Sequence, residues 1–374
     1  MLKFGENILW PQFYIFSLFT FLIAYISESN KDNEIILIKR RYSINVIALR
    51  FYFFILFLMA AFRGFEITND TLAYYNTFTN IRDRGFSGEL RMENGYVLLN
   101  VLLSKIFPDD VGFYVLLFIA SAFSYYVFER WIEKNTNTYG VCIIVFYFLM
   151  NPSFVCVTRQ TIAVSIVLLA LPLAQKHYYI RYTSLIVLAA LFHKSAIICL
   201  VFIFIINRRF NKISFFIIIS ISLVLVLGSS FISTIISILG IETSYETNET
   251  GGNVVSIILS LFYIVFFLLN YEKKRTTEET ESRNDFYLYC NVISVALYIM
   301  VYRMPILTRM NMYFYLPAVP YFSKVFYEIE NRRLATILRL CIVFVVFSYS
   351  YFALTLRPEW GHLWPYKTYW NSMY

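Results

Sequence analysis

Charged residues are scarce in this chain of 374 residues, of which only 15% are Asp, Glu, Lys or Arg. Soluble domains usually contain about 25% charged residues and less than about half apolar residues. Here 59% of the residues are hydrophobic. A soluble core of this size could not bury so much apolar surface. The composition therefore excludes an ordinary soluble protein and indicates helices that are surrounded by membrane lipid.

Cysteine is also rare, and the five cysteines lie in or beside apolar runs without a CxxC pair. We interpret them as small buried hydrophobic side chains. The sequence has no GxSxG, Walker loop, HExxH or GxGxxG motif, so we expect neither a metal nor another cofactor. The net charge of +8 has no soluble basic domain to carry it. We therefore expect no nucleic-acid partner and assign the charge to cytoplasmic loops.

Long apolar runs dominate the sequence and predict an all-α polytopic transmembrane helix bundle of about twelve spans, in one integral membrane domain over residues 1–374. The runs lie near 10–27, 43–62, 111–129, 139–153, 160–174, 180–193, 195–207, 213–236, 254–270, 286–302, 309–327 and 334–355. A simple span needs roughly 17–25 residues. The short runs within 160–207 are therefore candidates for broken or re-entrant helices, which survive at membrane depth only where protein or a water-filled cavity shelters them.

Basic residues alternate between the loops and set the expected orientation. Every second loop carries several Lys or Arg residues, for example Lys39-Arg40-Arg41 and Lys273-Lys274-Arg275. Positively charged loops remain in the cytoplasm. With twelve spans, both termini then lie outside, at the bacterial cytoplasmic membrane. Residues 271–285 become a cytoplasmic linker.

Two external features follow from this topology. An external loop at 63–110 contains a predicted interfacial helix that starts near Asn69, with Tyr74, Phe78 and Ile81 on one face. A second amphipathic helix is predicted at 96–107. The other external feature is a tail at 356–374, which is rich in Trp and Tyr.

Ionisable residues gather on the external side under this topology. They are Arg63, Asp70, Glu93, Arg159, His193, Lys194, Arg303 and Arg309. Ionisable groups at membrane depth are costly and usually face a cavity or a partner. Several arginines on one face predict an anion site, because a guanidinium binds phosphate bidentately and keeps its charge when partly buried. A lipid-linked pyrophosphate fits this prediction.

Each of these residues also has a structural explanation that the sequence leaves open. Arg63 would then extend to the membrane interface from the end of its span, and Asp70 would cap the helix that starts there. Glu93 would be a surface loop charge, and His193 an interfacial histidine. Arg303 and Arg309 flank Pro305, so an ordinary external turn also explains them.

Five short motifs, in order over roughly residues 60–320, resemble those of the EpsG family of polysaccharide polymerases. They are Phe62-Arg63-Gly64 with Asn69-Asp70-Thr71 and Tyr74-Tyr75; Glu93-Asn-Gly95-Tyr96; Arg159-Gln160; His193-Lys194-Ser195-Ala196; and Thr308-Arg309-Met-Asn-Met-Tyr313-Phe314. The resemblance implies a Wzy-like enzyme with an architecture like that of GT-C glycosyltransferases. It also implies that the enzyme polymerises O-antigen, capsule or exopolysaccharide repeat units carried on undecaprenyl pyrophosphate at the external membrane face. Its expected partners are these lipid-linked glycans, membrane lipid and a chain-length regulator protein.

For such a reaction the leaving pyrophosphate must be stabilised and the acceptor hydroxyl activated or oriented. We assign pyrophosphate binding to Arg159 and Arg309, with Arg63 and Arg303 in support. The candidate bases are Asp70, Glu93 and His193. Tyr74, Tyr75 and Tyr313 are candidates for stacking on sugar rings.

Two other functions fit the composition. A lipid-linked oligosaccharide flippase or other transporter would keep charges along a central pathway, often between repeated halves. In this sequence the charges cluster on one side and no repeat is visible. An O-antigen ligase, or a membrane acyltransferase, is the second alternative. A ligase would typically have a large late external loop, whereas the loop at 237–253 is short.

Overall fold

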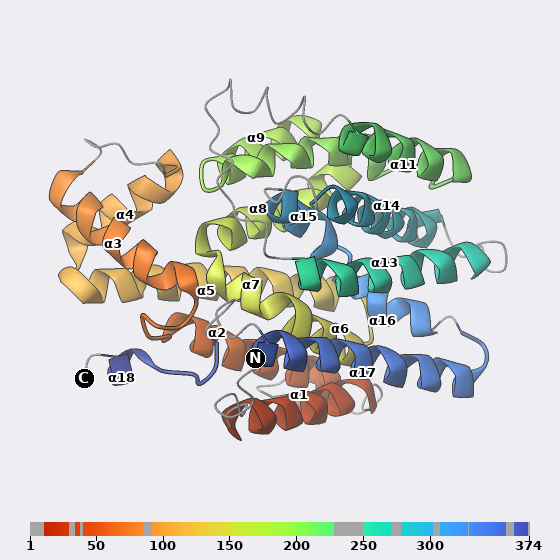
Figure 1. Ribbon diagram of the computed structural model, residues 1–374, viewed down its shortest axis with the longest axis horizontal. Helices are drawn as coiled ribbons and strands as arrows, with labels where there is room; N and C mark the ends of the chain where they lie inside the picture. The colour runs from red at the N-terminus through yellow and green to blue at the C-terminus, as the bar shows by residue number, and fades with distance from the viewer. Residues whose placement is uncertain are drawn as a thin grey trace, which may run out of the picture.

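The computed structural model describes residues 11–29, 34–37, 40–85, 92–227, 250–270, 278–301, 307–327, 329–356 and 363–372. These residues fold almost entirely into helices, most of which run roughly side by side (Figure 1). The helices are α1 Pro11–Ser29, α2 Ile44–Ala61, α3 Asn69–Arg84, α4 Asn94–Ile106, α5 Asp109–Asn135, α6 Gly140–Val145, η1 Phe146–Met150, α7 Asn151–Cys156, α8 Thr158–Gln175, α9 Tyr179–Ala190, η2 Lys194–Val201, α10 Phe202–Ile205, α11 Lys212–Leu227, α13 Thr250–Asn270, α14 Glu278–Val301, α15 Leu307–Tyr315, α16 Val319–Tyr327, α17 Arg332–Leu356 and α18 Tyr369–Ser372.

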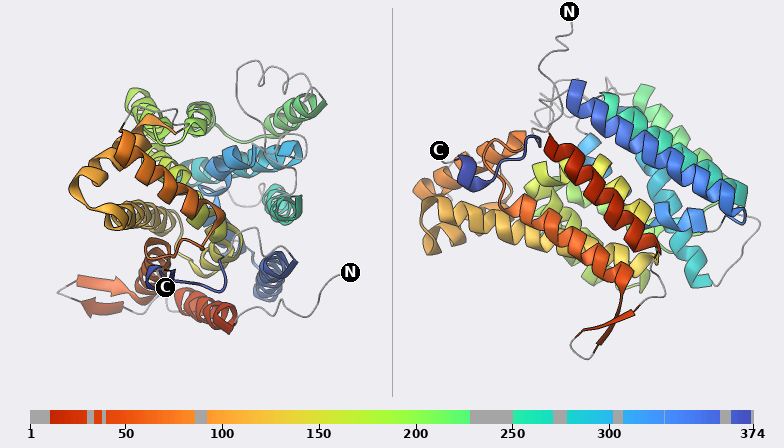
Figure 2. Two further views of the ribbon diagram at one scale, coloured as in Figure 1. Left: turned by 60° about the vertical axis from the view of Figure 1, so that its left-hand side comes forward. Right: turned by 90° about the horizontal axis from the view of Figure 1, so that it is seen from below.

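The helical class predicted from the apolar runs is confirmed in these residues, with one addition. An antiparallel hairpin joins α1 to α2, with β1 Glu34–Leu37 paired to β2 Arg40–Ser43 in a register that sets Glu34 opposite Ser43. Figure 2 shows this hairpin projecting from the helical body. The sequence analysis did not predict it, because four-residue strands are too short to give a clear alternating pattern.

Helix boundaries differ from the apolar runs at three places. The run at 309–327 forms two helices, α15 and α16. Helix α14 begins at Glu278, so it takes up the second half of the predicted linker at 271–285, whose first half lies outside the described residues. A helix can extend beyond its apolar stretch because polar residues in water are also good helix formers. Likewise α11 ends at Leu227, and the rest of the run at 213–236 lies outside the described part.

Five described helices are long and apolar enough to cross a membrane: Ile44–Ala61, Asp110–Asn135, Thr158–Gln175, Asn284–Val301 and Arg332–Thr355. The last of these has only 17% of its apolar window buried inside the protein. Its side chains Ile337, Leu340 and Phe344 are exposed. An exposed apolar face of this length requires an apolar environment. The finding supports a membrane protein, whereas the count of about twelve spans stays a prediction.

The region 158–205 agrees only in part with the broken or re-entrant helices that its short apolar runs predicted. Helix α8 is continuous for 18 residues. Helix α9 has 12 residues, and a 3₁₀ helix, η2, follows it after an irregular connection at 191–193. Non-helical backbone here places His193 between two helices.

Two apolar cores support the candidate site. The main core joins α2, α5 and η1 through aromatic contacts, in which the ring of Phe146 lies 5.2 Å from Phe53 and 4.7 Å from Phe128. A second core binds α3 and α4 to the start of α5 and includes Phe78, Tyr96 and Phe113. Figure 1 shows α3, α4 and α18 together at one side of the molecule. This second core packs the described parts of the predicted external loop, residues 63–85 and 92–110, into one unit.

The predicted C-terminal tail contains a segment, residues 363–372, that packs against α5 and the end of α2. The amide of Gly64 donates to the Lys367 carbonyl, and the amide of Tyr369 donates to the Phe62 carbonyl, both at 2.9 Å. Thr368 thereby forms an isolated antiparallel bridge with Arg63. The rings of Trp370 and Phe62 stack at 5.5 Å. The segment therefore fixes the backbone that carries Arg63.

Candidate functional site

Arg159, the second residue of α8, forms an ion pair with Glu93 immediately before α4. The two side chains are only 16% and 10% exposed. The guanidinium also lies 5.8 Å from the ring centroid of Tyr74 and 5.9 Å from that of Tyr96, within the range of cation–π attraction. Its Nε atom is buried without a hydrogen-bond partner among the described residues. Arg159 is thus held in place from three sides and retains an unused donor.

The carboxylate of Glu93 joins two parts of the site, because each of its oxygens has a different donor. One oxygen contacts Arg159, and the other accepts a hydrogen bond from the backbone amide of Lys194 at 3.2 Å. Glu93 is therefore engaged as a bridge between α8 and the connection that carries His193. This contradicts both a free surface charge and a free general base.

Gly95 allows this close approach of α4 to the connection after α9. Its amide donates to the Leu191 carbonyl at 2.8 Å. A Cβ atom at this position would lie 2.7 Å from that carbonyl oxygen, well inside van der Waals contact. With Glu93 and Tyr96, Gly95 accounts for the Glu-Asn-Gly-Tyr motif as one packing unit around Arg159 and His193.

His193 immediately precedes η2 with an extended backbone. Its Nδ1 atom lies 2.6 Å from the Ser195 hydroxyl, which in turn donates to the Tyr313 hydroxyl at 3.4 Å. Burial lowers the pKa of His193 to about 4, and the nearby charge of Arg159 acts in the same direction, while Glu93 opposes it. The imidazole is therefore neutral at physiological pH, which a general base requires.

Arg309 lies in the first turn of α15, and its carbonyl accepts a hydrogen bond from the side chain of Gln160. Gln160 directly follows Arg159, so this bond ties α15 to the start of α8. The charge of Arg309 is close enough to lower the pKa of His193. Arg309 therefore lies near Arg159 and His193, and the roles that the sequence analysis assigned to these residues stay predictions. Arg303, the fourth predicted arginine, lies outside the described residues.

Arg63 does not belong to an open anion site in this structure, contrary to the supporting role that we assigned to it. Its side chain is 1% exposed. It donates to Thr71 Oγ1 at 2.9 Å, to the Ala60 carbonyl at 2.7 Å and to Thr158 Oγ1 at 3.0 Å. The simple interfacial explanation is also wrong, because the guanidinium points into the protein. Arg63 joins the ends of α2, α3 and α8, next to Arg159.

Asp70 occupies the first turn of α3 and is not its N-cap, which is Thr68. The cap explanation is therefore wrong, because the helix begins at Asn69, two residues earlier than a cap at Asp70 requires. Asp70 is also not the partner of Arg63, whose donors go to neutral oxygens. Thr68 has a positive φ of 63°, a conformation that costs free energy for a β-branched residue and that often marks functional sites.

Two of the three predicted sugar-stacking tyrosines are buried and pack on protein. Tyr74 is 5% exposed beside Arg159, and Tyr313 is fully buried beside Ser195. Neither ring can stack on a sugar in this conformation, so that assignment is corrected to a supporting one. Tyr75 is half-buried and donates to Asp110. It is the one of the three that retains accessible ring surface.

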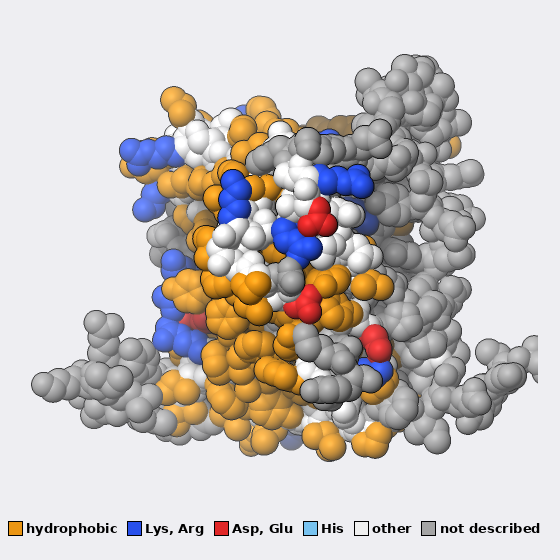
Figure 3. Space-filling model, turned by 90° about the vertical axis from the view of Figure 1, so that its left-hand side faces the viewer, with side chains coloured by type: hydrophobic (Ala, Val, Ile, Leu, Met, Phe, Trp, Pro, Cys, Tyr) orange, Lys and Arg blue, Asp and Glu red, His pale blue; other side chains and the backbone are white. Residues whose placement is uncertain are grey.

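Figure 3 shows one face of the protein, on which acidic and basic side chains lie close together among hydrophobic and polar ones.

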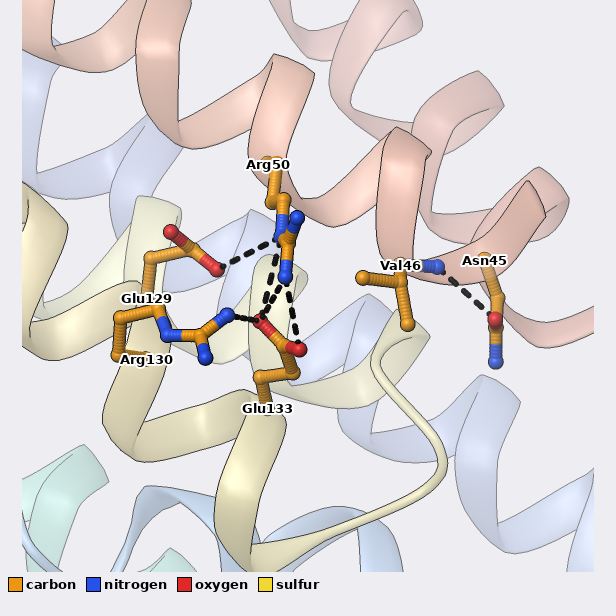
Figure 4. A network of polar contacts seen from close by, with 6 residues as sticks. All are labelled: Asn45, Val46, Arg50, Glu129, Arg130 and Glu133. Carbon is orange, nitrogen blue, oxygen red and sulfur yellow. Dashed lines mark hydrogen bonds and ion pairs between the residues drawn. The ribbon is translucent and has the colours of Figure 1, made fainter. Parts of the chain in front are cut away.

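A second charged cluster lies near the other end of α2. There Arg50 contacts Glu133 at 2.9 Å, and Arg130 contacts the same carboxylate at 2.5 Å (Figure 4). Arg50 precedes Arg63 by 13 residues, or about 20 Å along a helix. The charges of this second cluster pair with one another, which suits a structural role.

The arrangement can bind an anion and accept a proton at neighbouring positions. Two arginines supply charge-assisted donors, and a neutral histidine lies beside them. Among the described residues, no group of three or more His, Cys, Asp or Glu side chains could hold a metal ion. The sequence analysis missed Ser195, Gln160 and Tyr96 as site residues. Their positions within the short motifs were the available signal.

Comparison with known protein families gives a match that covers most of the chain. The model of the EpsG family matches residues 46–368, which include every described residue of the site. None of the curated proteins and none of the solved structures matches the chain.

Proposed function

This chain belongs to the EpsG family of Wzy-like, polymerase-type membrane proteins, and we propose that it is a polysaccharide polymerase. The donor is a growing glycan on undecaprenyl pyrophosphate, and the acceptor is a single lipid-linked repeat unit. The bond between the anomeric carbon and the pyrophosphate oxygen breaks, and the pyrophosphate leaves with the electron pair. The acceptor hydroxyl oxygen bonds to the anomeric carbon, and its proton passes to a base.

The convergence of Arg159, Arg309 and His193 supports this proposal most strongly. Negative charge grows on the pyrophosphate as the bond breaks, and fixed guanidinium groups stabilise such charge without needing to reorganise. The Glu93 carboxylate and two tyrosine rings hold Arg159 in position before substrate arrives. Arg159 and Arg309 therefore bind the pyrophosphate, and His193 is the base.

Arg63 has a different role in this proposal from the one its sequence position indicated. It joins Thr71 of α3 to Thr158 of α8, and Thr158 directly precedes Arg159. A buried guanidinium with three partners is a rigid connection between these helix ends. Arg63 thus keeps Arg159 at the correct place without contacting the substrate.

Membrane orientation follows the distribution of basic loops. The site end of α2, α4 and α8 faces the periplasm or exterior, and the end carrying Arg50 and Arg130 faces the cytoplasm. This orientation delivers lipid-linked glycans to the site from the outer leaflet. A chain-length regulator is an additional partner, and the product belongs to O-antigen, capsule or exopolysaccharide biosynthesis.

Glycan analysis of a deletion strain, complemented with variants, tests the function. We expect the deletion to leave single repeat units on the surface and the wild-type gene to restore polymer. Arg159→Ala should fail to restore polymer at equal protein content. Arg181→Ala is a matched control, because this exposed arginine lies on α9 near the basic loops, and it should restore polymer fully.

The other functions give different results in the same experiment. Complete absence of surface glycan in the deletion strain would contradict a polymerase and indicate a flippase or a ligase. Accumulation of lipid-linked polymer that never reaches its final acceptor would indicate a ligase specifically. Polymer formation by purified protein in liposomes, from lipid-linked repeat units alone, would establish the transfer reaction directly.

A further inference from the structure

A small cavity lies beside the buried side chain of Arg63, between residues of α2, α5, α7 and α8. Its volume is about 10 Å³. Besides Arg63, the polar residues that line it are Ser121, Ser124, Tyr125, Thr158 and Thr161. A polar cavity needs roughly 10–15 Å³ to hold one water molecule, together with two to four hydrogen-bonding partners. The space therefore suits a single ligand of about the size of water.

The guanidinium of Arg63 has more donors than partners. It has five N–H groups, and its bonds to Thr71, Ala60 and Thr158 use three of them. Two N–H groups, one on each terminal nitrogen, therefore have no acceptor among the described residues. The side chain is 1% exposed, so bulk water does not reach it. A buried donor without an acceptor is costly, which indicates an acceptor in the cavity.

Ser124 lies on the α5 side of the cavity. The residue is 1% exposed, and its Oγ atom is buried without a hydrogen bond to any described residue. A helical serine commonly bonds to the carbonyl four residues before it, as Ser165 does with Thr161 at 2.8 Å. The unmet hydroxyl of Ser124 and the unmet N–H groups of Arg63 therefore belong to side chains that line one small space.

We propose that this cavity binds one water molecule, which accepts hydrogen bonds from Arg63 and bonds to the Ser124 hydroxyl. Water can accept from N–H groups and still donate its own protons. One proton can go to the hydroxyl oxygen of Tyr125, because Tyr125 gives its own proton to Asn151 at 2.6 Å. An internal water typically forms about three hydrogen bonds, and these groups supply that number.

Other ligands suit the cavity less well. The charge of Arg63 repels a cation, and an apolar molecule would leave the N–H groups unpaired. An anion would match the charge, because the three acceptors of Arg63 are uncharged oxygens. A chloride ion is larger than a water molecule, however, and the cavity is at the lower limit for water itself.

The water connects α5 to a junction that already joins three helix ends. Arg63 links the ends of α2, α3 and α8 through Ala60, Thr71 and Thr158. The bridge to Ser124 adds α5 to this set. A water at this place stabilises the junction whether or not the chain is a polymerase, so its loss should be measurable as lower thermal stability.

Replacing Ser124 with alanine tests the proposal through the melting temperature of the purified protein. Ser124→Ala should melt below the wild-type protein, because the water loses a partner. In a dry cavity the same change removes an unpaired buried hydroxyl and should raise the melting temperature, so a higher value would overturn the proposal. Ser184→Ala is the matched control for the helix propensity of alanine, since that exposed serine on α9 bonds only to its own helix at 3.0 Å.

The pair Ser124→Thr and Ser124→Val separates the hydroxyl from the space that the side chain occupies. Threonine and valine have nearly the same shape, so any strain affects both variants alike. Threonine keeps a hydroxyl for the water or for Arg63 and should melt above valine. A valine variant that melts at or above the threonine variant would contradict a hydrated cavity.

A cryo-EM map of the protein in lipid nanodiscs, at a resolution that shows ordered waters, tests the water directly. We expect one peak at about 2.7–3.2 Å from both the Arg63 guanidinium and Ser124 Oγ. A map with ordered waters elsewhere in the interior and none here would refute the proposal. The melting temperature should also stay the same when gluconate replaces chloride at equal ionic strength. A chloride-dependent melting temperature that is lost in Ser124→Val would identify a bound anion in place of water.

Discussion

Replacing Gly95 with alanine sets two opposing effects against each other. Alanine favours a helix over glycine by up to about 1 kcal/mol, so propensity alone predicts a more stable protein. The added Cβ would, however, lie 2.7 Å from the Leu191 carbonyl oxygen and 2.9 Å from its Cβ. The oxygen cannot turn away without cost, because it accepts the Gly95 amide at 2.8 Å.

The size of the clash decides whether Gly95→Ala stabilises or destabilises the protein. An ordinary contact needs at least 3.4 Å, so the connection must move by about 0.7 Å from its position at 2.7 Å. Overpacking of this kind costs about 1–3 kcal/mol, which exceeds the propensity gain. The same shift pulls the Lys194 amide from Glu93 and displaces His193. A misplacement of about 1 Å can cost 100-fold in rate, and we expect at least a tenfold loss of polymerisation.

Polymer formed by purified protein in liposomes measures the rate, and thermal aggregation in detergent measures the stability. Asn94→Ala is the matched control, because that exposed residue precedes Gly95 in the same turn. It should lower neither quantity. A Gly95→Ala protein that melts at or above the control and polymerises at the full rate would refute the close packing of α4 against the residue 191–193 connection.

Three further predictions follow from the site. Arg159→Lys should recover little of the activity lost in Arg159→Ala, because lysine keeps the charge but not the planar set of donors; a fully active lysine variant would mean that charge alone matters there. Burial lowers the pKa of His193 to about 4 from its usual 6.5, so the base stays neutral as pH falls, and the polymerisation rate should be level from about pH 7.5 to about pH 5. A pH–rate profile with its acid limb centred near 6.5 would contradict this. A chain ending after Leu356 lacks the segment that bonds to Phe62 and Gly64 and should insert normally but lose polymer. Lys367→Ala, which removes only the exposed ion pair with Glu66, should cost less than about 1 kcal/mol of stability and should retain polymer.

Much of the fold could be predicted because it depends mainly on apolar helices, and the local composition of the sequence reveals these. Apolar runs give the helices and their approximate ends, since a membrane-embedded helix satisfies its own backbone hydrogen bonds. The hairpin at 34–43 and the division of 309–327 into α15 and α16 carry no comparable pattern. Their formation depends on how the chain turns between packed helices.

Sequence patterns were enough to predict the helical class, the membrane-compatible helices and the set of short motifs that carry the site residues. It could not decide which of those residues meet. Arg63 and Asp70 are close in sequence, yet Arg63 bonds to Thr158, which lies 95 residues away. Glu93 was a candidate base until packing brought both of its oxygens to donors on α8 and beside His193. The tertiary structure decides these roles, because the partner of a buried charge is whichever donor or acceptor the packing of distant helices brings within about 3 Å.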